Sequence, residues 1–199
     1  MELQTTVNRI LLCGSPAAPA RFSHEVRARK FYLLPLEVQR LSGQYDRLNC
    51  LVSSLQLPLC EASRLRIEGP LRSFNNRSGE GARLVLTVLA KSILPADAED
   101  ENEVALTGTI CTAPKLRTTP LGRDICDLIL AVNRPYGRSD YLPCIFWGMR
   151  AREISLCPVG TKLTLTGRLQ SRRYIKVTQF GAVEKTAFEV SVGDFEILE

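Results

Sequence analysis

The feature that most constrains how this chain can fold is an internal repeat. The segment Val38–Cys50 aligns without a gap on Val132–Cys144, and valine, arginine, glycine, aspartate, leucine and cysteine recur at the same spacing. The same register, carried upstream, pairs Gly14 with Gly108. A shared spacing of this kind indicates two copies of one structural unit.

Two further matches follow in the same order in both halves. Segment 65–73 corresponds to 163–171, where leucine, glycine, leucine and serine recur, and 84–88 corresponds to 188–192. Three ordered matches predict a duplicated domain of roughly 95 residues. The stretch 95–103 (PADAEDENE) lies between the copies and holds five acidic residues and no basic one. We therefore predict a first domain at 1–94, an acidic linker at 95–103 and a second domain at 104–199.

Each copy is predicted to be a β-domain, because its segments alternate apolar and polar residues with a period of two. Segments 104–110, 163–169 and 188–192 of the second copy show this alternation. Glycines inside these patterns, Gly108 and Gly167, suggest bulges or tight bends of the kind found at barrel corners.

A short helix is predicted at Met149–Leu156, between the third and fourth strands, with Ala151, Ile154 and Leu156 facing inward. Five strands with a helix in this place make up the OB-fold, a small and partly open barrel. The predicted fold class is therefore all-β, with two tandem five-stranded OB-fold barrels, each with a short helix between strands three and four. A β-sandwich is the structural alternative.

The charge of the chain limits the kind of partner. The formal net charge is +5, although the acidic residues gather at 95–103, so the rest of the chain is more basic than this figure suggests. A basic surface often indicates a polyanionic partner. The charge alone fits a solvated surface of a mildly basic protein equally well.

The cysteines and the N-terminus indicate a reducing compartment. The seven cysteines form no C-x-x-C pair, and most have apolar neighbours, as reduced thiols do. His24 is the only histidine, so we expect no metal site and no cofactor. No apolar run approaches the roughly 18–20 residues that cross a bilayer. The N-terminus carries no export signal, and we expect a cytoplasmic protein.

Four stretches of the second half, taken in order, resemble the bacterial single-stranded DNA-binding protein family: 114–122 (PKLRTTPLG), 125–134 (ICDLILAVNR), 140–148 (DYLPCIFWG) and 167–174 (GRLQSRRY). The resemblance covers 104–178 strongly and 187–198 more loosely. The first half resembles the family mainly through its likeness to the second. The resemblance implies a protein that binds single-stranded DNA without strong sequence preference and protects it in replication, recombination or repair.

In that family, bases stack on aromatic residues at four places on the barrel. The resemblance maps these places onto Tyr136, Tyr141, Trp147 and Tyr174. Every base has a π-face, so stacking holds a strand without reading its sequence, and each stack contributes about 1–3 kcal/mol, a figure drawn from proteins of this same class. The alternative is that these rings fill the core. A polar turn around Tyr136 and basic neighbours of Tyr174 argue against it, and for Tyr141 and Trp147 it stays open.

Basic residues lie between these rings in the sequence and are candidates for contacts with phosphates. Neutralised phosphates release counterions, so the affinity should fall steeply with salt. With the four rings, the predicted binding set includes Arg117, Arg134, Arg138, Arg168, Arg172, Arg173 and Lys176, and Arg123 and Arg150 are further candidates.

The first copy lacks these rings. Ser42, Arg47, Ser53 and Asn76 stand at the corresponding positions, with Tyr45 and Phe74 close by in the sequence. We therefore expect the first barrel to contribute charge and assembly rather than stacking. The residues that keep this half basic are Arg40, Arg47, Arg64, Arg66, Arg72 and Arg77.

The resemblance also bears on assembly. The family usually assembles four barrels, so two barrels per chain imply a homodimer. Family members typically carry a flexible tail that ends in an acidic peptide and recruits other proteins. This chain ends at Asp194–Glu199, within or just after the last predicted strand, so tail-mediated recruitment is not expected.

No constellation typical of an enzyme appears, and we expect none. His24 lies beside Ser23 and Glu25, but neighbours on an extended segment point to opposite faces. No phosphate-binding loop, zinc-protease motif or dinucleotide fingerprint occurs. Two other classes of function stay open: an OB-fold protein-interaction or primosome component, and an RNA-binding module.

Overall fold

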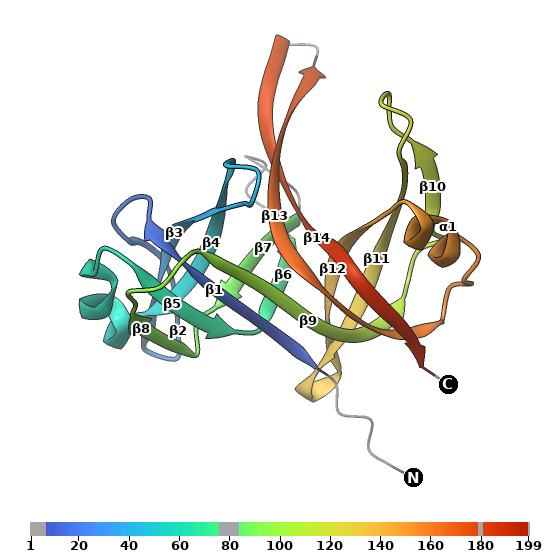
Figure 1. Ribbon diagram of the computed structural model, residues 1–199. Coiled ribbons are helices and arrows are strands. Elements are labelled where there is room, and N and C mark those ends of the chain that lie inside the picture. Colours follow the sequence, from blue (N-terminus) through green and yellow to red (C-terminus); the bar gives the residue numbers. More distant parts are fainter. Residues whose placement is uncertain (1–6, 76–83, 179–180, 199) are drawn as a thin grey trace. The chain divides into compact units, whose positions relative to one another are not determined.

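Figure 1 shows the computed structural model of the chain, which describes residues 7–75, 84–178 and 181–198, with 176–178 described by their backbone alone. The residues divide into two compact units. We name each unit after the sequence copy that supplies most of it. The repeat-1 unit consists of Ile10–Asn102 and Gln170–Phe188, and the repeat-2 unit consists of Met1–Arg9, Glu103–Leu169 and Glu189–Glu199.

The first copy forms strands linked by short turns and one 3-10 helix. β3 pairs with β1, β2 and β4, β5 pairs with β1 and β8, and β7 pairs with β6 and, in parallel, with β4. The elements are β1 (Asn8–Pro16), β2 (Arg21–Val26), β3 (Arg29–Gln39), β4 (Tyr45–Ser53), η1 (Ser54–Glu61), β5 (Leu65–Gly69), β6 (Leu71–Asn75), β7 (Leu84–Leu89) and β8 (Ser92–Pro95).

The second copy repeats this plan, and its last two strands, β13 and β14, are longer than their counterparts in the first copy. β9 pairs with β11 and β13, β11 pairs with β10 and β12, and β12 runs parallel to β14. The elements are β9 (Glu101–Ile110), β10 (Lys115–Thr118), β11 (Asp124–Arg134), η2 (Pro135–Gly137), β12 (Arg138–Trp147), α1 (Met149–Ser155), β13 (Lys162–Thr178) and β14 (Gly181–Leu198). The predominance of strands agrees with the predicted all-β class.

The repeat seen in the sequence extends to the pairing of strands. Val38 lies opposite Asp46 between β3 and β4, and Val132 lies opposite Asp140 between β11 and β12. The recurring cysteine lies where β4 meets β7 in parallel, and where β12 meets β14. Since side chains alternate along a strand, this shared register turns the same positions of both copies into the core.

The recurring arginine and aspartate form a buried ion pair in each copy. Nε and Nη2 of Arg40 donate to the two carboxylate oxygens of Asp46 at 2.8 and 2.6 Å, so the contact is bidentate. Arg134 donates to Asp140 in the same way, with 2.7 Å from its Nε. Both aspartates are fully buried. Bidentate hydrogen bonds of this kind are strong and directional, which accounts for the recurrence of both residues at one spacing.

In the repeat-1 unit, the ion pair also anchors the segment 170–188. The backbone N–H of Ser171 donates to Oδ1 of Asp46 at 2.6 Å, and the carbonyl of Ser171 accepts from Nη2 of Arg40 at 3.0 Å. A buried carboxylate needs several donors to offset its lost hydration. Ser171 supplies one of them, so the pair fixes this part of β13 within the unit.

Recurring glycines allow close approach of backbones. A Cβ on Gly14 would lie 2.2 Å from the carbonyl oxygen of Glu37, and one on Gly108 would lie 2.6 Å from that of Ala131. The pairing of β9 with β13 runs through Gly108 to Gly167 without a register shift. The bulges expected at these two glycines are therefore wrong for this pairing, and the close approach is the physical reason for glycine there.

Replacing Gly167 with alanine should destabilise the protein by about 1–3 kcal/mol, because overpacking forces the backbone to shift. The new Cβ would lie 2.3 Å from the carbonyl oxygen of Ser191. Gly193→Ala is the matched control, since the nearest atom to its Cβ, the oxygen of Thr166, is 3.7 Å away. Urea unfolding measures both variants. Equal free energies of unfolding would show that Gly167 has no such constraint.

The helix α1 lies between β12 and β13, and its residues Ala151 and Ile154 are buried as expected. Leu156 is 85% exposed, so the expectation that it faces inward is wrong. It comes two residues after Ile154, a rotation of about 200° around a helix of 3.6 residues per turn, so its side chain points away from the buried face. Within the described ranges, no helix is long and apolar enough to cross a bilayer.

Both ends of the acidic stretch 95–103 belong to strands. Strands β8 and β9 leave only 96–100 between them. Asp100 forms an ion pair with Arg64 at 2.6 Å, and Glu101 forms one with Arg66 at 2.7 Å. Two of the carboxylates that we expected in a solvated linker are therefore bound to arginines of the first copy.

The cysteines are free thiols. Burial raises the pKa of Cys50 to about 12, and it also raises the pKa of Cys144. These thiols are protonated at neutral pH and pack as small apolar groups, as the sequence predicted. Among the described residues, no group of three His, Cys, Asp or Glu side chains could hold a metal ion.

Candidate nucleic-acid interface

The sheet β10–β11–β12 of the repeat-2 unit has one face in the core and one face outward. Leu128 and Leu130 of β11 lie opposite Cys144 and Leu142 of β12, and all four are buried. The alternate residues of the two strands point to the other side, which we call the outer face. In an OB-fold, this face of strands two and three is where oligonucleotides bind.

Two of the four predicted rings lie on the outer face. Tyr141 is 52% exposed and Trp147 is 38% exposed, so neither fills the core. They are six residues apart on β12, which separates them by about 20 Å along the strand. Nε1 of Trp147 donates to Oγ of Ser191 at 3.1 Å, and this hydrogen bond fixes the orientation of the indole. Sequence alone gave no indication of Ser191.

Tyr136 lies in the turn between β11 and β12. Its side chain is 99% exposed, and its backbone is in the left-handed region with φ 65° and ψ 35°. A non-glycine residue in this region costs of order 1 kcal/mol or more, and such residues gather at ligand sites. Arg138 follows the turn and is exposed as well.

Arg117 lies in the same row of the outer face as Trp147. Arg117 of β10 is opposite Ile125 of β11, which is opposite Trp147 of β12. Its Nε donates to Asp127 at 2.5 Å, and this hydrogen bond raises the pKa of the guanidinium. The pair is exposed, so a phosphate can compete with Asp127 for the arginine at little cost.

Arg134 has a different environment from the one predicted. Its side chain forms the ion pair with the buried carboxylate of Asp140, and only 23% of it is exposed. An arginine that leaves a buried carboxylate unpaired destabilises the fold by several kcal/mol. We therefore assign Arg134 to the stability of the fold rather than to the contact with phosphates.

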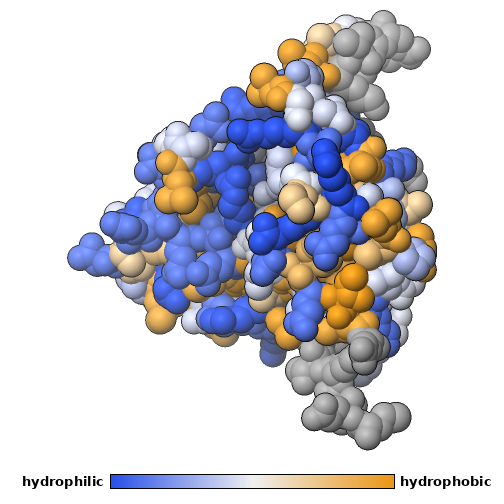
Figure 2. All heavy atoms as spheres, turned by 45° about the vertical axis from the view of Figure 1, so that its right-hand side comes forward, coloured by the Kyte–Doolittle hydropathy of each residue, from blue (hydrophilic) through white to orange (hydrophobic). Residues whose placement is uncertain are grey.

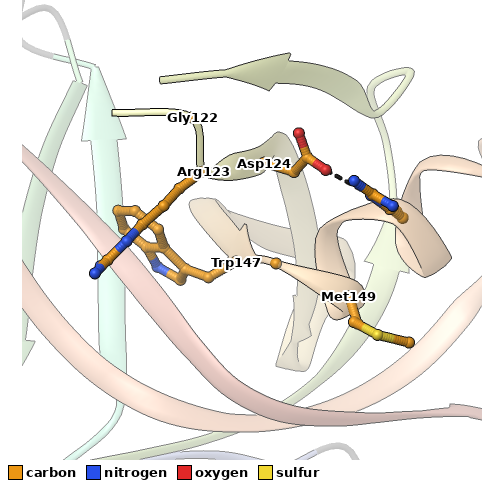
Figure 3. A pocket seen from close by; sticks show the side chains of 7 residues that line it. Gly122, Arg123, Asp124, Trp147 and Met149 are labelled. Atoms are coloured by element: carbon orange, nitrogen blue, oxygen red, sulfur yellow. Dashed lines mark hydrogen bonds and ion pairs between the residues drawn. The ribbon is translucent and has the colours of Figure 1, made fainter. Parts of the chain in front are cut away.

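A cleft of about 570 Å³ lies beside Trp147 (Figure 3). It forms where the turn before β11 meets the start of α1, and glycines with positive φ, Gly122 and Gly148, lie at its edges. Apart from these two glycines, no residue pattern in the sequence indicates this cleft. The other residues that line it are Arg123, Asp124, Met149 and Arg152.

The charges of the cleft are arranged on two sides. Arg123 extends on the side of the indole of Trp147, whereas Asp124 points to α1 and binds Arg152 at 2.5 Å (Figure 3). The hydrogen bonds from Arg152 and Thr118 lower the pKa of Asp124. Asp124 is therefore a carboxylate at neutral pH that is already matched by a cation, and Arg123 is the cation of the cleft that faces the ring.

The remaining predicted residues lie on β13. Arg168 belongs to the repeat-2 unit, whereas Arg172, Arg173 and Tyr174 belong to the repeat-1 unit. The guanidinium of Arg172 lies over the ring of Tyr174 at 5.7 Å from its centre, a cation–π contact. Arg173 is exposed and lies 3.7 Å from Glu184. The side chain of Lys176 lies outside the described part of the structure.

In the first copy, the residues at the positions of the rings make other contacts. Arg47, which corresponds to Tyr141, forms an ion pair with Glu37 at 2.6 Å. Tyr45 and Phe74 are exposed at 59% and 46%. Asn76 and Arg77 lie outside the described residues. Among the arginines expected to make this half basic, Arg40, Arg47, Arg64 and Arg66 are all bound to carboxylates.

Hydrophilic residues cover much of the face shown in Figure 2, and hydrophobic residues interrupt them in separate patches.

Curated relatives match part of the chain. The single-stranded DNA-binding protein of Halalkalibacterium halodurans is 32% identical over 80 residues, which are 37% of this chain and 48% of that protein. The protein of the same name from Streptococcus mutans is 32% identical over 105 residues, which are 49% of this chain and 62% of that protein. The chain thus spans about half the length of the first curated relatives it matches.

Solved structures match nearly the whole chain. The wild-type single-stranded DNA-binding protein from Thermus aquaticus superposes with a TM-score of 0.74 at 23% identity, over 98% of this chain and 94% of that chain. A deletion mutant of that protein gives a TM-score of 0.75 over 98% and 95%. At this identity, the likeness shows that the fold is shared.

The family model that matches this chain is the Single-strand binding protein family, over residues 101–198. The matched residues include the outer face of β10, β11 and β12, the turn at Tyr136, and strands β13 and β14. The second copy of this chain is therefore similar in sequence to the Single-strand binding protein family.

Proposed function

We propose that this chain binds single-stranded DNA without strong sequence preference and protects it in replication, recombination or repair. The observation that carries the proposal is the position of Tyr141 and Trp147 on the outer face of β12, exposed and oriented for contact with bases. Stacking rings on this face of an OB-fold serve a binding protein rather than an enzyme. The match of residues 101–198 to the model of the Single-strand binding protein family supports the same function.

We propose that each copy forms one OB-fold barrel, at 1–94 and 104–199, joined by 95–103. The equivalent strand pairings of the two copies support this division. In each copy a helical element follows the strand that carries the recurring aspartate: η1 follows β4 in the first copy, and α1 follows β12 in the second. The first copy differs in that its fourth and fifth strands are interrupted, as β5 with β6 and β7 with β8.

The proposed stacking rings are Tyr136, Tyr141, Trp147 and Tyr174. The phosphates of the strand would lie against exposed cations. The cations that fit this description are Arg117, Arg123, Arg138, Arg172 and Arg173, with Arg168 and Lys176 as further members from the sequence.

The test of this function is a fluorescence titration of the full chain with oligo-dT. Trp147 is the only tryptophan, so quenching of its emission reports stacking at that ring. Each phosphate neutralised on a single strand contributes about −0.7 to the slope of log affinity against log salt, so three to five contacts give a slope of about −2 to −3.5. The proposal fails if the emission is unchanged or if the affinity is independent of salt.

We propose further that the chain acts as a homodimer, which would bring four barrels together. The chain has a mass of 22.2 kDa, so light scattering should give about twice this mass. The mass of a single chain would refute the dimer and leave the binding function intact.

A further inference from the structure

In the first copy, Ser53 occupies the position that corresponds to Trp147, and an aromatic ring lies on the adjacent strand. The pair Ile125–Trp147 of β11 and β12 corresponds to the pair Phe31–Ser53 of β3 and β4. His24 of β2 lies opposite Phe31 in the same row. The ring that is missing from β4 is therefore replaced by Phe31 on the adjacent strand β3 and by His24 on β2, the strand beyond it. A comparison of single positions cannot detect this displacement.

The two rings are stacked on each other. Their centres are 5.3 Å apart and their planes are inclined by 17°. Phe31 is half-buried, whereas His24 is exposed. Oγ of Ser23 lies 3.0 Å from Nδ1 of His24, which restrains the rotation of the imidazole. The stack thus has a fixed base on Phe31 and an exposed ring on which a further planar group can lie.

A bulge in β2 brings His24 to this face. The register of β2 against β3 shifts between Phe22 and His24, which leaves Ser23 as the extra residue. In a regular strand, Phe22 and His24 would point to the same side. Here Phe22 meets Tyr32, and His24 meets Phe31, whose side chain points to the opposite face. Bulges often redirect a side chain at functional sites.

The hairpin that carries His24 is rich in basic residues. The hairpin 21–30 has four basic residues and one acidic residue, Glu25, and all ten residues are exposed. Arg21 lies opposite Leu33, and Arg29 is two residues before Phe31, so both share the face of Phe31. Within the described ranges no ion pair involves the four basic residues, unlike the arginines of this copy bound to carboxylates. The four basic residues of the hairpin are Arg21, Arg27, Arg29 and Lys30.

The tip of the hairpin is also strained. Arg27 and Ala28 both have positive φ, at 47° and 61°. Two-residue turns of this kind favour asparagine and glycine, so an arginine and an alanine there cost of order 1 kcal/mol each. Strain of this kind is found where a loop has a role in binding.

We infer that Arg21, His24, Arg29 and Phe31, here named the β2–β3 platform, form a second stacking site for single-stranded DNA. The inference rests on the proposed function and adds to it. One base of the strand lies on the imidazole of His24, and the phosphates on either side of it contact Arg21 and Arg29. Stacking on histidine and pairing with arginine are independent of sequence. The first copy thus contributes stacking, in contrast to the expectation from the sequence.

The test compares the wild-type chain with a His24→Ala, Phe31→Leu double variant, using oligo-dT of increasing length. Short strands that are held by the rings of the second copy should bind both proteins equally. Long strands should bind the variant about 5- to 100-fold more weakly, the loss expected for one stack. A separate Arg21→Ala, Arg29→Ala variant, which changes only exposed side chains, should reduce the salt slope for long strands by about 1.4.

Phe22→Leu is the matched control, since it removes an exposed ring of the same strand that points away from the platform. It should bind every length as the wild type does. The platform is refuted if the wild type binds oligo-dT and both platform variants match it at every length. If the wild type itself binds no oligo-dT, the proposed function fails, and the platform fails with it.

Discussion

A chain in which Tyr141 and Trp147 are both replaced by alanine should bind oligo-dT at least about 30-fold more weakly than the wild type, because each lost stack contributes about 1–3 kcal/mol. Both side chains are exposed on the outer face of β12, so their removal leaves the core intact. Fluorescence anisotropy of a labelled strand measures the effect without relying on the emission of Trp147.

The control for this result is the pair of substitutions Tyr141→Phe and Trp147→Phe. Phenylalanine keeps an aromatic ring at both positions. It loses the hydroxyl of Tyr141, and at position 147 it loses the second ring of the indole and the N–H that binds Ser191. We expect this variant to bind within about tenfold of the wild type, since most of the stacking area remains. Equal losses for the alanine and phenylalanine variants would show that stacking is not what holds the strand.

The second large effect is on stability. Asp140→Ala should lower the free energy of unfolding by about 3–5 kcal/mol, because it leaves the guanidinium of Arg134 without its buried partner. For a protein of this size, each kcal/mol lowers the melting temperature by about 2–4 °C, so a fall of about 6–20 °C is expected. Calorimetry or circular dichroism measures it. The equivalent Asp46→Ala should act in the same direction, since Asp46 is equally buried.

Asp127→Ala provides the matched control for the ion pair. Asp127 also binds an arginine, Arg117, but both side chains are largely exposed. Exposed pairs contribute about 0–1 kcal/mol, so the melting temperature should change by only a few degrees. If Asp140→Ala were as mild as Asp127→Ala, the recurring arginine and aspartate would have no structural role.

Sequence patterns predicted the strands and their register well, for a physical reason. Alternation with a period of two decides which face of a strand is buried, and a shift of one residue would expose the whole core. The ungapped match of Val38–Cys50 with Val132–Cys144 therefore carries over to equivalent pairings in the structure. Tyr141 and Trp147 were indicated by the resemblance to a family, which left open whether they fill the core, and the structure shows that both are exposed.

Other features depend on contacts between distant parts of the chain, and the sequence could not show them. The carboxylates that bind Arg64 and Arg66 lie in the acidic stretch. A count of arginines therefore overestimated the positive charge that the first copy can offer to phosphates. Arg134 looked like a residue for phosphates, although the buried Asp140 binds it. The displaced ring of Phe31 needs the pairing of three strands to be recognised.

The central claim is that single strands are the ligand, and one competition experiment tests it most directly. A labelled oligo-dT is bound to the full chain, and unlabelled single-stranded DNA, duplex DNA and single-stranded RNA of equal length are added in turn. Stacking requires unpaired bases, so single-stranded DNA should displace the label at concentrations at least about 100-fold lower than duplex DNA does. Equal displacement by duplex would contradict the account, and stronger displacement by RNA would show that the ligand is RNA instead.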